Sequence, residues 1–276
     1  MEYEAHAKIN LFLNVLGRRP DGYHALCTIM HAIDLCDTVF LEPAKEISVS
    51  ANVALPERSA ARRAAEAYQA AAGTEGARIH IHARIPPEAG LGSSSADAAA
   101  VLRGMQALYG ALSDAALLVL AARIGADVPF CLTGGCALCE GIGEQITPLP
   151  AMPLDLLIVK GTRGISTKAL FESLVLPLPE GDAGAAVAAL RAGDKRALAQ
   201  RVYNALAAPA ARFAPETMEF AARLRAAGAQ AACMTGSGSA VFGIFASHAE
   251  AERAKGVFAD AAVVQVCRTL PFSAKT

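Results

Sequence analysis

A loop of glycine and serine residues between a strand pattern and a helix pattern constrains this chain more than any other feature. Residues 78–85 alternate polar and apolar side chains, which predicts a strand that Pro86-Pro87 ends. Residues 96–108 are rich in alanine and leucine, which favours a helix. Gly90 and Gly92 let backbone N–H groups turn toward an anion, and a helix that begins here adds unpaired N–H groups. The loop therefore predicts an anion site, although a flexible turn before an ordinary capped helix gives the same pattern.

The loop matches neither the GxxxxGK[ST] phosphate loop nor the GxGxxG dinucleotide pattern. Its three consecutive serines can add hydroxyl donors to the backbone N–H groups. A net charge of −1 provides no field that would gather nucleic acid or an anionic membrane. A phosphate-rich ligand must therefore be held by a local site.

Composition predicts an ordered protein without a membrane partner. Apolar residues make up 54% and charged residues 18% of the 276 residues, which excludes intrinsic disorder. Neither a secretory signal at Met1 nor an apolar run of roughly 20 residues is present, so a cytoplasmic location is expected. The seven scattered cysteines predict reduced, packed thiols. Cys136-x-x-Cys139 lacks a second pair and a nearby histidine, which argues against zinc.

Strand and helix patterns alternate only in part, which predicts an α+β fold in two lobes rather than a doubly wound sheet. Prolines cluster at 148–153, so the expected domains are residues 1–150 and 151–276. The first strand has an apolar face and a mostly polar face, which predicts half burial. The expected strands are 5–15, 27–41 with a break near 34–37, 78–85, two within 134–148, 154–159, 240–245 and 262–266. The expected helices are 59–72, 96–108, 113–124, 166–175, 183–192, 194–206, 215–227 and 249–258.

Four further features can carry chemistry, and each has a plain alternative. Lys8 lies within the first strand, where most lysines are solvated. Asp127 follows a predicted helix, where an aspartate is commonly a local cap. Tyr23-His24 follows a Pro-Asp-Gly turn and could stack on a base, although exposed turn residues rarely do so. Residues 235–239, Thr-Gly-Ser-Gly-Ser, allow a close backbone approach to a ligand or to the other lobe, or form a simple tight turn.

Taken in order along the chain, these features resemble the GHMP kinases. Pro86 to Ser94 matches that superfamily's P-x-x-x-G-L-G-S-S loop, and residues 235–239 match its C-terminal glycine motif. The runs Ala7–Leu11, Gly17–His24 and Gly125–Phe130 are similar to the branch that phosphorylates a cytidylylated alcohol in the non-mevalonate route to isoprenoid precursors. The resemblance extends from residue 5 to about 245.

This resemblance implies an N-terminal α+β lobe, a C-terminal ferredoxin-like lobe, and ATP with Mg²⁺ as reactants. The small cytidylylated alcohol would be the partner of a monomer or homodimer, and no metal ligand is identified. Asp127 would be the catalytic base and Lys8 its partner. The cytidine end of the substrate would be held by Asn10, Tyr23, His24 and Phe171. The triphosphate would be cradled by Pro86, Pro87, Glu88, Ala89, Gly90, Leu91, Gly92, Ser93, Ser94, Ser95 and Ala96.

The chain departs from the family pattern around the nucleotide. Its loop has fewer glycines than usual, and Ser59 and Ala83 replace a common asparagine and lysine, which leaves the adenine contacts unassigned. Two alternatives stay open. A GHMP kinase for another alcohol, such as mevalonate or homoserine, would not need the base-stacking pair Tyr23-His24. A non-catalytic nucleotide sensor would not need both Lys8 and Asp127.

Overall fold

The structure is a computed structural model that describes residues 1–271. Residues 272–276, at the end of the expected second domain, lie outside the described part. The chain is 35% helix and 31% strand, which confirms the α+β class. It divides into two compact units, and the long first two strands contribute residues to both. Unit 1 holds residues 1–7, 35–85 and 92–134, and unit 2 holds residues 8–34, 86–91 and 135–276.

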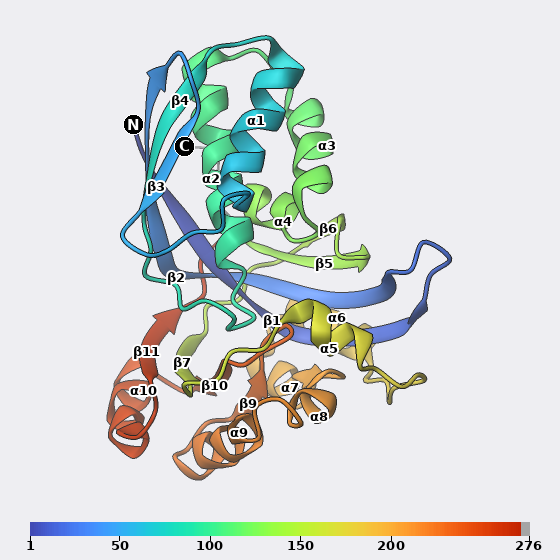
Figure 1. Cartoon of the computed structure of the whole chain (residues 1–276). Coiled ribbons are helices and arrows are strands. Elements are labelled where there is room, and N and C mark those ends of the chain that lie inside the picture. Colours follow the sequence, from blue (N-terminus) through green and yellow to red (C-terminus); the bar gives the residue numbers. More distant parts are fainter. Residues whose placement is uncertain (272–276) are drawn as a thin grey trace. The chain divides into compact units, whose positions relative to one another are not determined.

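Unit 1 is a small sheet with helices packed on it (Figure 1). Besides the start of β1 (Glu2–Arg18), it contains part of β2 (His24–Ala44), β3 (Ser48–Ala51), β4 (Gly76–His82), α1 (Ala60–Ala72), α2 (Ser93–Tyr109), α3 (Asp114–Ile124) and α4 (Val128–Thr133). β4 pairs antiparallel with β2 and parallel with β3. A Cβ atom on Gly104 would lie 2.6 Å from the methyl groups of Leu41. Helix α2 therefore lies directly against β2.

Unit 2 contains the remaining parts of β1 and β2 together with a separate antiparallel sheet (Figure 1). Its further elements are β5 (Cys136–Gly141), β6 (Gln145–Leu149), β7 (Asp155–Lys160), α5 (Thr167–Glu172), α6 (Ala183–Ala192), α7 (Lys195–Ala199), β8 (Tyr203–Asn204), α8 (Ala207–Ala210), α9 (Glu216–Ala226), β9 (Ala231–Met234), β10 (Val241–Phe245), α10 (His248–Ala254), the 3₁₀ helix η1 (Lys255–Phe258) and β11 (Val263–Arg268). β1 pairs with β8, and β2 pairs with β5, which pairs with β6.

The separate sheet has the strand order β11-β7-β10-β9, with α9 between β7 and β9 in the chain and α10 between β10 and β11. This is the βαββαβ order of a ferredoxin-like lobe, as expected. Phe220, Leu224 and Phe258 pack on this sheet in one buried apolar cluster. Because the two compact units interleave along the chain, they do not test a single cut near residue 150, and that boundary stays a prediction.

Most of the expected elements are confirmed, including the helices expected to begin at residues 59 and 113. The Ser59 and Ser113 side chains accept hydrogen bonds from Arg62 N–H and Ala116 N–H at the starts of α1 and α3. Two expectations were wrong. β2 continues without a break near 34–37, and residues 194–206 form α7 followed by strand β8 instead of one helix. No helix in residues 1–271 is long and apolar enough to cross a membrane.

The expected half burial of the first strand was also wrong, because both faces of β1 are buried from Ala7 to Val15. The polar side chains are buried because they find partners within the protein. The Asn14 amide, for example, donates to Gly181 O at 3.0 Å and accepts from Gly181 N–H at 2.9 Å. The prediction of reduced thiols is confirmed, since all seven cysteines are free and are buried or partly buried.

Candidate active site

Lys8 is the centre of a buried polar network in unit 2. Its side chain is only 4% exposed, so it is not the solvated lysine that the plain alternative supposed. Lys8 Nζ donates to Asn10 Oδ1 at 2.7 Å and to Gly90 O at 2.9 Å. Each bond satisfies one ammonium proton and holds the charge at the predicted phosphate segment. Two sequence-predicted site residues, Lys8 and Asn10, therefore meet a third, Gly90.

Asn10 is fixed by further bonds that the sequence did not reveal. Its Nδ2 donates to Thr28 Oγ1 at 2.8 Å, and that hydroxyl donates to Phe12 O at 2.6 Å. Its backbone N–H donates to Thr235 Oγ1 at 3.0 Å. The Asn10 carboxamide is thereby oriented with Oδ1 toward Lys8. Thr28 gave no signal in the sequence because it lies inside a strand pattern without a motif.

The glycine motif at 235–239 approaches the segment 88–90 at backbone distance. Ser239 N–H donates to Glu88 O at 3.0 Å, and Ala240 N–H donates to Ala89 O at 3.1 Å. A Cβ atom on Gly90 would lie 2.1 Å from Thr235 O. Only glycine permits such an approach at position 90, so the expected close backbone contact of this motif is made with the segment predicted to bind phosphate.

The start of α2 supplies the anion-attracting feature in unit 1. Gly92 adopts a left-handed conformation with φ +77° and has no side chain to cap the helix. The first turn, which includes Ser93, Ser94 and Ser95, contains no carboxylate. The positive end of a 17-residue helix is therefore left uncompensated by the side chains of that turn. Ser94 is exposed and Ser93 and Ser95 are partly exposed, so their hydroxyl groups can reach a ligand.

Asp127 directly precedes α4, also in unit 1. Its backbone carbonyl accepts from Cys131 N–H at 3.0 Å, but its carboxylate forms no cap bond to the described backbone of that helix. The side chain thus shows no helix-cap bond, while the residue itself lies in a turn before α4. A Cβ atom on Gly125 would lie 4.0 Å from Ser95 Oγ, which places the segment that carries Asp127 beside the first turn of α2.

The residues predicted to hold the cytidine end fall into two places. The rings of His24 and Phe171 are in contact, with centroids 5.2 Å apart and planes tilted by 37°. Burial, followed by the charge of Arg18, lowers the pKa of His24, so its imidazole is neutral near pH 7 and can both donate and accept. Tyr23 is 62% exposed at the turn. Asn10 belongs to the Lys8 network instead.

A pair of buried aspartates in unit 1 was missed by the sequence reasoning. Asp37 on β2 is 1% exposed and Asp97 on α2 is 8% exposed, and each carboxyl group acts on the pKa of the other, so the two side chains are neighbours. Asp37 lay in a predicted strand break, and Asp97 lay beside the serine run without a recognised role. Only their meeting in space distinguishes them from surface acids.

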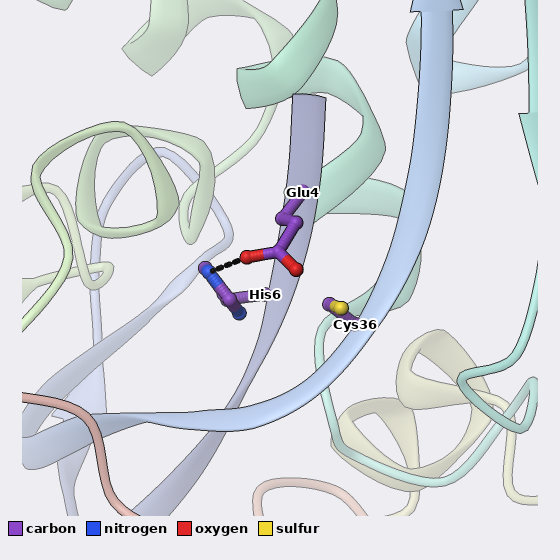
Figure 2. A group of neighbouring side chains, drawn as sticks. All are labelled: Glu4, His6 and Cys36. Atoms are coloured by element: carbon purple, nitrogen blue, oxygen red, sulfur yellow. Dashed lines mark ion pairs between the residues drawn. The ribbon is translucent and has the colours of Figure 1, made fainter. Parts of the chain in front are cut away.

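One group of three potential metal ligands is found among residues 1–271, namely Glu4, His6 and Cys36 (Figure 2). Their ligand atoms lie within 4.8 Å of one another, and His6 Nε2 is 3.3 Å from Glu4 Oε2. Mg²⁺ prefers oxygen ligands, so a set with a thiol and an imidazole does not fit it. Burial raises the pKa of Cys136 to about 12, which keeps this thiol protonated.

A hollow of about 770 Å³ lies between α6 and the strands β2 and β5. Its lining includes Cys27, Leu138, Glu140 and Arg191 together with small residues of α6, and it includes none of the predicted site residues. The predicted site residues are therefore found elsewhere, in the Lys8 network, the His24–Phe171 pair, and the segment that leads into α2.

Comparison with known proteins gives consistent matches over most of the chain. Residues 59–135 match the GHMP kinases N terminal domain, and residues 186–263 match the GHMP kinases C terminal domain. A 4-diphosphocytidyl-2-C-methyl-D-erythritol kinase of Caldicellulosiruptor saccharolyticus is 42% identical over 266 residues, which cover 92% of this chain and 91% of the relative. A relative of the same name in Moorella thermoacetica is 41% identical and covers 90% and 91%.

The solved structures agree. A crystal structure of 4-(cytidine 5'-diphospho)-2C-methyl-D-erythritol kinase is 37% identical, with a TM-score of 0.84 and coverage of 98% of this chain and 99% of that one. Homoserine kinase from Cytophaga hutchinsonii has a TM-score of 0.73 at 19% identity, with 97% and 95% coverage, and so shares the fold.

Proposed function

Because this chain belongs to the 4-diphosphocytidyl-2-C-methyl-D-erythritol kinases of the GHMP superfamily, we propose that it phosphorylates the 2-hydroxyl of that cytidylylated alcohol with ATP. The family relationship makes the chain an ATP-dependent small-molecule kinase of non-mevalonate isoprenoid biosynthesis. The cytoplasmic location and the choice between monomer and homodimer stay predictions.

The observation that favours a cytidylylated substrate over other alcohols is the contact between His24 and Phe171. An aromatic ring offers a stacking face to a pyrimidine, and a neutral imidazole can hydrogen-bond its edge. Mevalonate and homoserine have no base that would use these groups. Tyr23, which is exposed at the adjacent turn, is proposed as a second stacking ring. Asn10 is proposed to contact the same substrate from the Lys8 network.

Asp127 is proposed as the general base. It would accept the proton of the 2-hydroxyl while that oxygen forms a bond to the γ-phosphorus and the bond between this phosphorus and the ADP oxygen breaks. A positioned base contributes roughly 10²–10⁴-fold to the rate. The position of Asp127 supports the role, because the segment 125–127 lies beside the first turn of α2, which follows the glycine loop.

Lys8 is proposed to stabilise the negative charge that develops during the transfer. Its bonds to Asn10 Oδ1 and Gly90 O support the role, since they fix a buried ammonium beside the segment proposed to bind phosphate. Residues 86–96 are proposed to hold the triphosphate through backbone N–H groups, serine hydroxyls and the start of α2. The uncapped first turn of α2 is what supports this assignment.

Mg²⁺ is proposed to accompany ATP, and when bound it neutralises charge on the β- and γ-phosphates. The Glu4–His6–Cys36 group does not fit it, so we give the ion no protein ligand and assign no step to it.

A comparison of three alcohols tests the substrate. Phosphorylation is measured with ATP and, in turn, 4-diphosphocytidyl-2-C-methyl-D-erythritol, mevalonate and homoserine. Turnover with the cytidylylated alcohol alone is expected. Preference for either of the other alcohols would contradict the proposed substrate, and binding of ATP without turnover of any of them would indicate a sensor.

A further inference from the structure

Two buried carboxyl groups act at the two ends of the segment proposed to bind phosphate, residues 86–96. Asp37 Oδ1 accepts from the N–H groups of Arg84, at 2.5 Å, and Ile85, at 2.7 Å. These are the last two residues before the segment 86–96, and Asp97 is the first residue after it. All four residues belong to unit 1. A contact between Asp37 and Asp97 therefore ties the two ends of the segment together.

We propose that Asp97 is a positioning residue that retains a proton and donates it to Asp37, so that the pair fixes the backbone on both sides of residues 86–96. Two ionised carboxylates have acceptors only and cannot hydrogen-bond to each other. A hydrogen bond between the neighbouring carboxyl groups of Asp37 and Asp97 therefore requires one shared proton. The inference rests on the proposed phosphate-binding role of residues 86–96.

The environment decides which carboxyl is protonated. Asp37 already accepts two backbone N–H bonds, which favour its charged form. Asp97 Oδ1 has no hydrogen-bond partner among residues 1–271, so nothing there stabilises a charge on this oxygen. Burial, followed by the charge of Asp37, raises the pKa of Asp97 to about 8. Burial raises the pKa of Asp37 as well, and its two N–H donors oppose that shift.

Few other charges act on the pair. Arg84, beside Asp37, is the cation that favours the ionised form of Asp37, and its side chain is exposed and therefore screened by solvent. The charge that acts on Asp97 is that of Asp37 itself. The pair at neutral pH thus carries one negative charge and one proton.

The sign of the pH effect follows from the raised pKa of Asp97. The folded protein retains a proton that the unfolded chain releases above its ordinary pKa of 3.8. The contribution of Asp97 to the free energy of unfolding therefore falls as the pH rises from about 4 to about 8. Above about pH 8 this contribution changes no further. Above about pH 8 the pair holds two repelling charges, and the segment 86–96 loses its fixed ends.

The test compares three variants in the ligand-free and nucleotide-bound protein. Asp97→Asn keeps a neutral side chain that donates to Asp37, whereas Asp97→Ala removes the donor. Glu66→Gln neutralises a surface acid of α1 as a control. ATP binding is measured by calorimetry at about pH 7 and about pH 9, and melting temperature is followed from about pH 5 to about pH 9.

We expect wild type and Glu66→Gln to bind ATP more weakly at about pH 9, and Asp97→Asn to bind equally at both pH values. The ATP affinity of Asp97→Ala at about pH 7 should be lower than that of wild type by roughly tenfold or more, because a hydrogen bond to a buried charge is lost. The pH slope of the melting temperature should decrease in both Asp97 variants, because neither retains the titrating carboxyl group, and should be unchanged in Glu66→Gln. The proposal would be wrong if the ATP affinity of Asp97→Asn fell at about pH 9 as that of wild type does. It would also be wrong if Asp97→Asn bound ATP as weakly as Asp97→Ala at about pH 7.

Infrared difference spectra give a readout that needs neither activity nor a folded alanine variant. Wild type should show a protonated-carboxyl C=O band at about pH 7 that disappears at about pH 9 and is missing in Asp97→Asn. Without that band the shared proton does not exist. If the band is present but the Asp97 substitutions leave ATP binding unchanged, the shared proton exists and residues 86–96 do not bind the triphosphate. The spectra and the binding measurements therefore test the proton and the phosphate-binding role separately.

Discussion

Gly90→Ala is expected to separate the two backbones that meet at the Lys8 network. The new methyl group would lie 2.1 Å from Thr235 O and 2.8 Å from Gly238 N, closer than Cβ atoms approach backbone. Neither atom belongs to a flexible side chain that could turn away. Gly90 also has φ +71°, a conformation that alanine adopts only with strain. The segment 88–90 must therefore move away from residues 235–240.

The magnitude follows from the bonds that this movement breaks. Left-handed strain costs about 1 kcal/mol. The bonds from Ser239 N–H to Glu88 O and from Ala240 N–H to Ala89 O contribute about 1 kcal/mol each. The free energy of unfolding should thus fall by about 3 kcal/mol, which corresponds to a melting temperature lower by about 6–12 °C for a chain of this size.

Gly193→Ala is the matched control. Gly193 ends α6 in the same unit with φ +67°, and a Cβ atom there would meet no atom within 4 Å. It should show the strain of about 1 kcal/mol alone. Both variants are compared by thermal and urea unfolding, and ATP binding should weaken only in Gly90→Ala. Equal destabilisation of the two variants would refute the close approach of the two backbones.

Three further substitutions test the proposed roles. Asp127→Asn should fold and bind ATP but lower kcat by roughly 10²-fold or more in steady-state assays, and a near-normal kcat would remove Asp127 as the base. Lys8→Ala should lower kcat, whereas a change confined to KM for the cytidylylated substrate would leave it only a binding role. Phe171→Ala should raise KM for that substrate while KM for ATP stays the same, because Phe171 contacts His24. An equal rise in both KM values would contradict the cytidine role.

Features encoded by neighbouring residues were predictable from the sequence. A serine followed by a helix pattern gave the starts of α1 and α3, since a cap involves residues only three positions apart. The strand–loop–helix at 78–108 was predictable for the same reason. The family relationship, carried by motifs at 86–94 and 235–239, extended this local reading to the ferredoxin-like lobe.

Features that depend on distant partners were not predictable. The alternation of β1 indicated a solvated polar face, but Asn10 and Asn14 are buried because Thr28 and Gly181 satisfy their amides. Strand pattern alone does not say what packs on the second face. The break predicted near 34–37 was wrong for the same reason, because Asp37 is buried in β2 and accepts hydrogen bonds from the N–H groups of Arg84 and Ile85, which are distant in the sequence.

Lys8 and Asp37, two of the buried charged residues of the described structure, share a feature that sequence patterns do not contain. A buried polar or charged group is tolerated where it holds a backbone segment that has no regular hydrogen-bonding partner of its own. Lys8 does this for Gly90 O, and Asp37 does it for the N–H groups of Arg84 and Ile85. Both act on the same stretch of chain, residues 84–90, from different strands. These two buried charges therefore help to fix the backbone of the loop proposed to bind phosphate, where exact position has a large effect on transfer.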